Sequence, residues 1–212
     1  MYKHFALALA VVAFSTVAIA DDGVNDIFQI SYAAHLNIGD SFVNITNSGA
    51  TTTEAIPASV DPVGTSQNLC ANLYVFDPAE ELISCCTCLV TPNGLLSLSV
   101  LQSLVSNPLT PGVPTSAVIK VVADLGCNAA TVTPGSVAHG LLAWGTTLHQ
   151  NTSTAAPSYG VTETAFSQAA LSAAELTHIT STCGFIQANG SGFGICSGCP
   201  IPPPAITVAP AK

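Results

Sequence analysis

Apolar and polar residues alternate with a period of two along much of the chain, which predicts β-strands. In Leu95–Leu101, leucines and Val100 alternate with serines, and Leu69–Phe76 shows a similar alternation. Comparable patterns predict four further strands, at Ile27–Tyr32, Ser41–Thr46, Ala117–Ala123 and Leu141–Trp144. Turn sequences such as Asp77-Pro78 and Pro92-Asn93-Gly94 separate these segments. Short strands with frequent turns and no strand–helix–strand rhythm predict a mainly β fold, a β-sandwich of the Ig-like or a related kind.

One short helix is expected near the C-terminus. Ser172-Ala-Ala-Glu175 has the form of a capping box, in which the serine side chain accepts from the backbone near the glutamate. Leu176, Ile179 and Cys183 then recur on one helical face. Gly184 is suited to the left-handed position that ends a helix, so the helix is predicted to stop there.

The two ends of the chain differ from its middle. Residues 1–20 combine a weakly basic start, an apolar stretch over Phe5–Ala13 and the small-residue sequence Ala18-Ile19-Ala20, which predicts a cleaved secretory signal peptide. Residues 200–212 are rich in proline and predict an extended tail. We therefore expect a single β-sandwich-like domain over residues 21–199, with loops at Asn47–Asn68 and Gly145–Gly160. The protein is expected to be secreted, extracellular or on the cell surface, with the periplasm as a further possibility.

The acidic net charge of the chain argues against anionic binding partners. The 212 residues include 12 acidic residues and only three Lys or Arg, giving a formal charge of −9. After cleavage only Lys120 and Lys212 would remain as cations. Binding to nucleic acid or to an anionic membrane needs many Lys and Arg side chains, so neither is an expected partner. No segment after the signal peptide is long and apolar enough to predict membrane insertion.

All eight cysteines fall after the predicted cleavage site: Cys70, Cys85, Cys86, Cys88, Cys127, Cys183, Cys196 and Cys199. An even number in an exported chain predicts disulfides, although eight cysteines allow 105 pairings. If Asp77–Glu80 is a four-residue turn, Cys70 lies opposite Thr87 in a hairpin. That geometry favours a bridge from Cys70 to Cys86 or Cys88. Cys183 would close a short loop onto Cys196 or Cys199.

Two other kinds of cysteine chemistry remain open. Cys85-Cys86-x-Cys88 and Cys196-x-x-Cys199 together have the makings of a thiolate metal site. Cys196-x-x-Cys199 alone could be redox-active, but a proline-rich segment follows it rather than the helix that would lower a thiol pKa. Because export favours oxidation, disulfides are the prediction, and no metal or cofactor is expected.

No catalytic constellation is evident in the sequence. The histidines that follow the signal peptide, His35, His139, His149 and His178, form no ligand pair, and Glu80-Glu81 reads as a solvated turn. A Gly-x-Ser-x-Gly motif is missing from the sequence. We therefore predict a non-catalytic extracellular structural or surface protein. The alternative is an adhesin or binding module that recognises a polymer or another surface through Gly145–Gly160, with Trp144 and Tyr159 as aromatic contacts.

The structural hypothesis includes self-assembly. Val24–Tyr32 begins soon after the cleavage site and places Phe28, Ile30 and Tyr32 on one face. Such a segment can add to the exposed sheet edge of a neighbouring subunit, and repeated addition gives a fibre. A homo-oligomer or fibre is therefore a candidate assembly. The alternative is that this segment is the first strand of its own sandwich.

Several stretches resemble a family of uncharacterised exported bacterial proteins that contain cysteines. They are Leu69–Pro78, Ser84–Cys88, Thr91–Leu95, Asn107–Ser116, Trp144–His149 and Cys183–Cys196. The resemblance covers most of the chain after the signal peptide and implies export. The family has no assigned activity, so the resemblance implies no functional residue.

Overall fold

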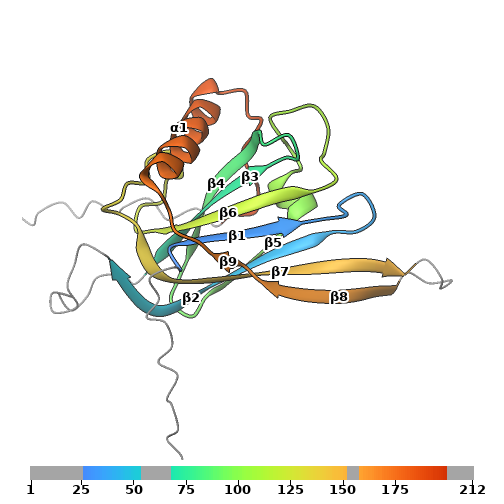
Figure 1. The fold of residues 1–212 in the computed structure, drawn as a ribbon, viewed down its shortest axis with the longest axis horizontal. Helices are drawn as coiled ribbons and strands as arrows, with labels where there is room; N and C mark the ends of the chain where they lie inside the picture. The colour runs from blue at the N-terminus through green and yellow to red at the C-terminus, as the bar shows by residue number, and fades with distance from the viewer. Residues whose placement is uncertain (1–25, 54–67, 152–157, 200–212) are drawn as a thin grey trace, which may run out of the picture.

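The computed structural model describes residues 26–53, 68–151 and 158–199; the predicted signal peptide and proline-rich tail lie outside them. Two antiparallel sheets pack face to face (Figure 1). Sheet A has the strand order β4-β3-β6-β1-β9, and sheet B has the order β5-β2-β7-β8. The strands are β1 (Phe28–Ala33), β2 (Ser41–Thr53), β3 (Leu69–Phe76), β4 (Leu82–Val90), β5 (Leu95–Ser99), β6 (Ala117–Asp124), β7 (Ala138–Asn151), β8 (Ser158–Ala165) and β9 (Ser167–Gln168), with a π-helical turn η1 (Val100–Leu104) and a helix α1 (Ala173–Asn189).

This architecture confirms the predicted mainly β fold with two sheets, one C-terminal helix and several disulfides. The alternating pattern predicted both the first and the last residue of β3 correctly, and it predicted the first residue of β2, β5 and β6. The predicted loop over Gly145–Gly160 is wrong, because β7 continues to Asn151 and pairs with β8. All eight residues of β8 are exposed, so this strand has no apolar face that could create a period of two.

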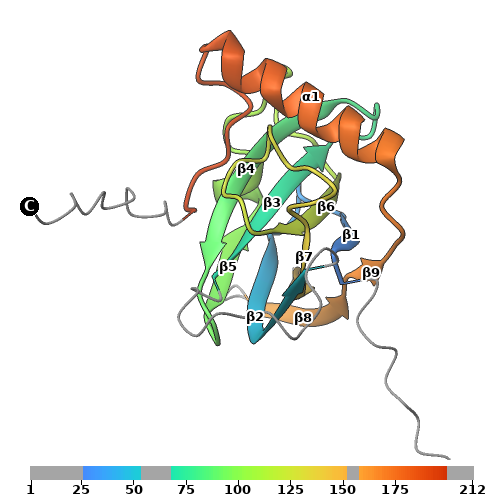
Figure 2. The same cartoon turned by 90° about the vertical axis from the view of Figure 1, so that its left-hand side faces the viewer.

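Sheet A is covered on both faces, which makes three layers. One apolar cluster fills the space between the sheets. Helix α1 lies over the other face of sheet A (Figure 2), and a second apolar cluster lies between them. Strand β3 is buried along its whole length. Leu73 points toward sheet B and its neighbour Tyr74 points toward the second cluster, as successive side chains in a strand must.

Helix α1 begins as predicted but ends later. The Ser172 hydroxyl accepts a hydrogen bond from the Glu175 backbone N–H at 3.1 Å, as an N-cap does. Gly184 lies inside the helix, where a Cβ would come within 3.6 Å of the Ala130 side chain. The left-handed residue is Gly190, with φ of 64°. A Cβ at Gly184 would make only ordinary van der Waals contact, so close packing does not explain this glycine, and the predicted stop at Gly184 is wrong. Among the described residues, no helix is long and apolar enough to cross a membrane.

The β3–β4 hairpin has a different register from the expected one. Cys70 lies opposite Leu89, and Leu73 lies opposite Cys86. The Asp77 N–H donates to the Glu81 carbonyl at 3.0 Å, so the turn holds only the three residues 78–80, and Phe76 lies opposite Leu82 instead of Glu81. A bulge near Phe76 adds a further shift. The predicted pairing of Cys70 across this hairpin therefore has no geometric basis.

Candidate functional site

Within the described residues all eight cysteines form disulfides and none is free. The Cα–Cα distances of the pairs run from 4.7 to 5.9 Å, which is normal for disulfides. The pairs are Cys70–Cys127, Cys85–Cys183, Cys86–Cys196 and Cys88–Cys199. The disulfide prediction is confirmed, and both favoured pairings are wrong. Cys70 reaches the loop after β6 instead of β4, and Cys183 reaches β4 instead of the C-terminal cysteines.

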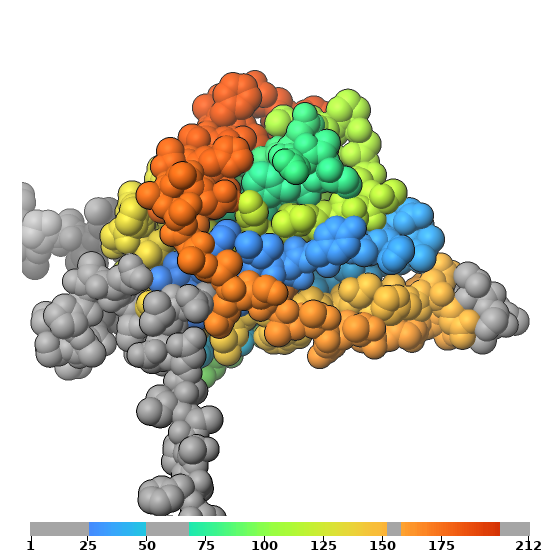
Figure 3. Space-filling view, viewed as in Figure 1, coloured from blue at the N-terminus to red at the C-terminus, as the bar shows by residue number. Residues whose placement is uncertain are grey.

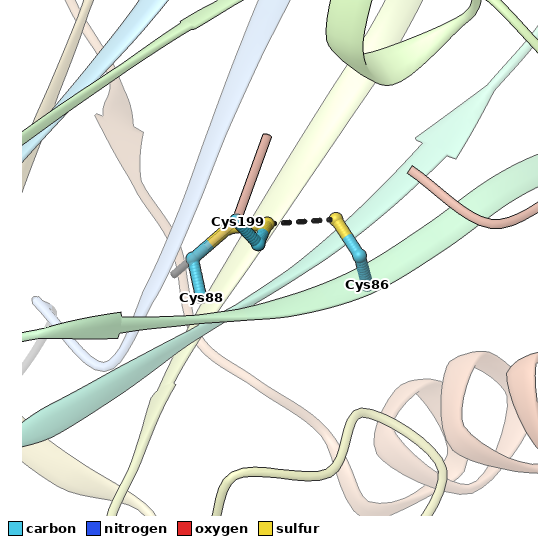
Figure 4. A group of neighbouring side chains, drawn as sticks. All are labelled: Cys86, Cys88 and Cys199. Carbon is cyan, nitrogen blue, oxygen red and sulfur yellow. Dashed lines mark hydrogen bonds between the residues drawn. A yellow bond between two sulfur atoms is a disulfide. The ribbon is translucent and has the colours of Figure 1, made fainter. Parts of the chain in front are cut away.

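Strand direction explains how β4 holds three cysteines. Adjacent residues of a strand point to opposite faces, so Cys85 faces α1 and bonds Cys183. Cys86 and Cys88 share the other face, where they meet Cys196 and Cys199. Figure 4 shows Cys199 bonded to Cys88, with Cys86 beside it. The Sγ atoms of Cys199 and Cys86 are 3.6 Å apart, although they are not bonded to each other.

The C-terminal segment also covers the free edge of β4. The Cys85 N–H donates to the Gly194 carbonyl at 2.9 Å, and the Leu109 N–H donates to the Ile83 carbonyl at 2.8 Å. The Gly194 N–H in turn donates to the Asn107 carbonyl at 2.8 Å. The backbone groups at the β4 edge of sheet A are thus hydrogen-bonded to other parts of the same chain. They are not available to pair with a strand of another subunit.

The corresponding edge of sheet B is bare in the described part of the chain. Strand β8 ends the sheet and pairs only with β7. Its sequence, Ser-Tyr-Gly-Val-Thr-Glu-Thr-Ala, contains no Lys, Arg or Pro. The β7–β8 hairpin extends away from the rest of the sandwich (Figures 1 and 3). Glu163 is the one charged side chain that this strand presents.

The face of sheet B that points away from sheet A carries a mixture of aromatic, aliphatic and amide or hydroxyl groups. The strand registers place the following residues on it, and we refer to them as the outer face: Phe42, Asn44, Thr46, Leu95, Ser97, Ser99, Leu142, Trp144, Thr146, Leu148, Tyr159, Val161, Glu163 and Ala165. Trp144 is partly buried, and Tyr159 is 50% exposed. The two aromatic residues predicted as contacts therefore lie on one sheet face instead of in a loop.

A chain of hydrogen bonds crosses the outer face from one edge of the sheet to the other. The Ser97 hydroxyl donates to Asn44 Oδ1 at 2.7 Å, and Asn44 Nδ2 donates to Thr146 Oγ1 at 2.9 Å. The Thr146 hydroxyl then donates to Glu163 Oε1 at 3.3 Å. Four strands each contribute one member. This polar ladder orients the Glu163 carboxylate and leaves its second oxygen available to accept from a ligand.

A cleft of about 460 Å³ opens between the two sheets, beside β1 and under β7 and β8. Its walls include Ile30, Tyr32, Val118 and Phe166, and hydroxyl groups such as that of Thr164. None of the residues that line it is charged. The cleft has the volume of a small-molecule site.

The predicted assembly strand lies inside the subunit. All six residues of β1 pair with β6, and β9 pairs on its other side. Phe28 is buried with the cluster under α1, whereas Tyr32 is exposed. On the opposite face the Gln29 amide donates to the Leu141 carbonyl at 2.9 Å and accepts from the Ala143 N–H at 3.1 Å. The structure thus matches the alternative, a first strand of its own sandwich.

One histidine has a carboxylate partner. His139 Nδ1 lies 2.5 Å from Asp26 Oδ1, and the Gly140 N–H donates to Asp26 Oδ2 at 2.7 Å. In the described part of the chain, Nε2 of His139 contacts no hydroxyl or thiol that it could activate. The pair links the start of the domain to β7. The expectation of no catalytic activity remains a prediction.

Three buried polar side chains lie between sheet A and the loop after β6. Asp124 and Asn72 are at most 1% exposed, and Asp124 Oδ1 and Asn72 Nδ2 have no hydrogen-bond partner among the described residues. Burial raises the pKa of the Asp124 carboxyl, against the opposing effect of hydrogen bonds from Ser136 and nearby backbone N–H groups. Burial, with a smaller contribution from Asp124, also raises the pKa of Tyr74. The Tyr74 hydroxyl donates to the Ala129 carbonyl at 2.7 Å.

No family model matches the chain, and no curated protein or solved structure matches it.

Sequence reasoning identified Trp144, Tyr159 and the cysteines but missed the polar ladder. Its members are spread over residues 44 to 163 and form no motif. Only the strand registers bring them together. A weak signal exists in Asn44 and Ser97, polar residues in the middle of strands whose neighbours are apolar.

Proposed function

We propose that this protein is a non-catalytic extracellular surface protein that binds an uncharged polysaccharide on the outer face of sheet B. The observation that carries the proposal is the combination of Trp144 and Tyr159 with the polar ladder on one face. Sugar rings present apolar C–H faces that pack on aromatic rings, and hydroxyls that bond to amides, hydroxyls and carboxylates. The outer face offers both kinds of contact.

The extracellular location is supported by four disulfides, which persist in oxidising compartments. The distribution of lysine fits the same setting. Lys120 is the one lysine between the predicted cleavage site and the terminal Lys212. It lies in the central strand β6, where Nζ is 2.6 Å from Glu175 Oε1 and 4.4 Å from the centre of the Phe76 ring. Trypsin-like proteases have little access to such a site.

Charge favours a neutral polymer over an anionic one. The outer face contains the Glu163 carboxylate and no cationic side chain among its residues. A phosphate- or sulfate-bearing polymer would be repelled by this carboxylate and would find no counter-charge. A neutral chain lying across β2, β7 and β8 would meet Asn44, Thr146 and Glu163 in succession, with Trp144 beside Thr146 on the same face of β7.

The test is adsorption of the purified mature protein to insoluble neutral polysaccharides such as cellulose, chitin and xylan. We expect depletion from solution by at least one of them, with Trp144→Ala weakening the binding about tenfold or more, which corresponds to about 1.4 kcal/mol. Phe185→Ala is the matched control, since Phe185 is 68% exposed on α1, away from sheet B. The proposal fails if the wild-type protein binds none of the polymers, or if both variants lose binding equally.

A second candidate function is structural self-assembly, and the bare edge of β8 favours it. An edge strand without Lys, Pro or a covering segment can pair with the same strand of a second subunit. In a symmetric antiparallel pair centred between Val161 and Thr162, Glu163 would face Gly160 of the partner subunit, so the carboxylates would not oppose each other. This candidate replaces β1 by β8 as the associating strand.

Val161→Lys tests this candidate, because a lysine on β8 discourages edge pairing. Val113→Lys is the control, as Val113 is 54% exposed in a loop away from β8. Sedimentation equilibrium at high concentration should show a dimer or larger assembly for the wild-type protein and Val113→Lys, and a monomer for Val161→Lys. A monomeric wild-type protein would exclude assembly through β8.

A further inference from the structure

Two pairs of cysteines meet on one face of β4 for reasons that do not depend on the disulfides. Cys86 and Cys88 are two residues apart on a strand, so their side chains point the same way. Cys196 and Cys199 follow Ile195, which lies alongside Cys85 as a parallel bridge. Backbone pairing with β4 thus brings the two pairs together.

The turn that carries Cys196 and Cys199 has its own anchors. The Ser197 N–H donates to the Ser103 carbonyl at 2.9 Å, and its hydroxyl donates to the Gln102 carbonyl at 3.1 Å, both in the π-helical turn η1. Gly198 has φ of 80°, and a Cβ there would lie 3.2 Å from the Ser103 hydroxyl oxygen. The turn is therefore held against η1 by bonds that survive reduction of the cysteines.

The sulfur atoms lie close enough together to share one ion once the two disulfides are reduced. The Sγ atoms of Cys86, Cys88 and Cys199 lie within 4.8 Å of one another (Figure 4). Cys196 is bonded to Cys86. Four thiolates about 2.3 Å from a zinc ion stand roughly 3.8 Å from each other. Cys199 and Cys86 already have a separation of 3.6 Å. The remaining change is an outward rotation of the two bonded pairs once their bonds are reduced.

A buried hydroxyl lies at one of these sulfurs. Ser84 is 1% exposed, and its Oγ donates to Cys196 Sγ at 3.3 Å. A disulfide sulfur is a weak acceptor, whereas a metal-bound thiolate is a strong one whose charge such a donor stabilises. The hydroxyl therefore suits the thiolate form of this group better than the oxidised form.

We propose that Cys86, Cys88, Cys196 and Cys199 bind one thiophilic divalent cation, for which Zn²⁺ is the probe, when the protein is reduced. A dithiol reductant supplies two electrons and two protons to each of the two disulfides, giving four thiols. Binding of the ion then releases four protons to solvent. Oxidation of the four cysteines by a disulfide such as oxidised glutathione reforms both bridges and releases the ion, and the oxidant is reduced to thiols. The same four residues thus alternate between a metal site and two disulfides.

The other two disulfides define the limit of the site. Cys85 and Cys183 meet on the opposite face of sheet A, and Cys70 at the start of β3 is bonded to Cys127 in the loop after β6. Neither pair can supply a ligand to an ion beside Cys86. The structure therefore excludes Cys85 from the grouping of Cys85-Cys86-x-Cys88 with Cys196-x-x-Cys199 that the spacing suggested.

The experiment uses the mature chain, fully reduced and refolded without oxygen, and titrated with Co²⁺ as a coloured substitute for Zn²⁺. We expect about one ion per chain, with the near-ultraviolet thiolate-to-metal band and the red d–d bands of a tetrahedral sulfur site. Cys88→Ser/Cys199→Ser should lose these bands. Cys85→Ser/Cys183→Ser, which also removes two thiols, should keep them. Adding oxidised glutathione should release Zn²⁺ to a chromophoric chelator.

If the reduced chain is unfolded before metal is added, the far-ultraviolet circular dichroism gives a second measurement. Zn²⁺ should then restore β-structure in the Cys85→Ser/Cys183→Ser variant and not in Cys88→Ser/Cys199→Ser. Equal metal binding by both variants would show nonspecific thiol coordination and overturn the proposal. So would a wild-type chain that binds no Co²⁺ in the tetrahedral form.

Discussion

The edge strand β4 of sheet A and the edge strand β8 of sheet B differ in what covers them. In sheet A the free edge of β4 is occupied by the backbone of Leu109 and Gly194, and three disulfides fix the strand from its two faces. In sheet B the edge strand β8 is exposed along all eight residues, contains no cysteine, and pairs only with β7 within residues 26–53, 68–151 and 158–199. The β4 edge is closed by backbone hydrogen bonds and held by disulfides, whereas the residues of β8 face solvent.

This difference indicates that sheet A supports the fold, whereas sheet B is available for contacts with other molecules. Sheet A is buried between α1 and sheet B, so its residues are committed to packing. Sheet B has one solvent-facing side, and its aromatic groups and polar ladder are on that side. Lys120 is ion-paired in the central strand β6, so between the predicted cleavage site and Lys212 no lysine is left to block an exposed strand, and the edge that must stay closed depends on burial and disulfides.

The largest expected effect comes from releasing β4 on the face that binds the C-terminal segment. Cys86–Cys196 and Cys88–Cys199 close nearly the same loop, with sequence separations of 110 and 111 residues. Replacing all four cysteines by alanine should lower the free energy of unfolding by about 4–5 kcal/mol, as expected for a loop of this length.

Replacing only Cys88 and Cys199 should cost much less, because the remaining bridge already restricts the unfolded chain. Chemical denaturation of the oxidised proteins measures both values. Equal losses from the single bridge and from both bridges would contradict the redundancy of these two disulfides.

The next effect concerns the segment that covers the β4 edge. Gly194 has φ of 75°, and a Cβ there would lie 2.8 Å from Ile186 Cγ2 and 3.3 Å from the Ile83 carbonyl oxygen. Gly194→Val should therefore cost about 2–3 kcal/mol through backbone strain and overpacking. Gly135→Val is the control, since a Cβ at Gly135 meets nothing within 4 Å. A shift in thermal midpoint that is the same for both variants would show that the close contact at Gly194 does not matter.

A smaller effect is expected from the buried carboxyl group in sheet A. Burial raises the pKa of Asp124 in the folded protein above its value in the unfolded chain, which is about 4. The folded state therefore holds this proton more tightly, and its stability falls as the pH rises from the unfolded-chain pKa through the folded-state pKa.

Asp124→Asn replaces the titrating carboxyl by a neutral amide and so removes its contribution to the pH dependence of stability. The stability of the variant relative to the wild-type protein should improve as the pH rises from about 4 toward neutrality, as measured by urea denaturation at several pH values. Parallel stability curves for the two proteins would mean that Asp124 does not experience the desolvation described above.

The sequence was informative where an element has a regular apolar face that is buried. Leu69–Phe76 and the capping box at Ser172 were located correctly because local pattern and turn chemistry decide them. Strand β8 was missed because neither of its faces is buried, so its side chains carry no alternation. The disulfide pairs were missed because they depend on a turn length and a bulge near Phe76 that shift the hairpin register.

The candidate site was less predictable than the fold. Trp144 and Tyr159 stood out as aromatic residues, but their common face follows from the pairing of β7 with β8. The polar ladder joins four strands through three side-chain hydrogen bonds, and none of its members is a sequence neighbour of another. Such a group exists only after the registers of three strand pairs are fixed.

Hydrogen–deuterium exchange, with and without soluble oligosaccharides of the polymer that the protein adsorbs to, tests the central claim most directly. We predict new protection confined to the amides of β2, β7 and β8, with no change in β4 or α1. Protection that appears in sheet A or α1 while sheet B is unchanged would contradict the assignment of binding to the outer face.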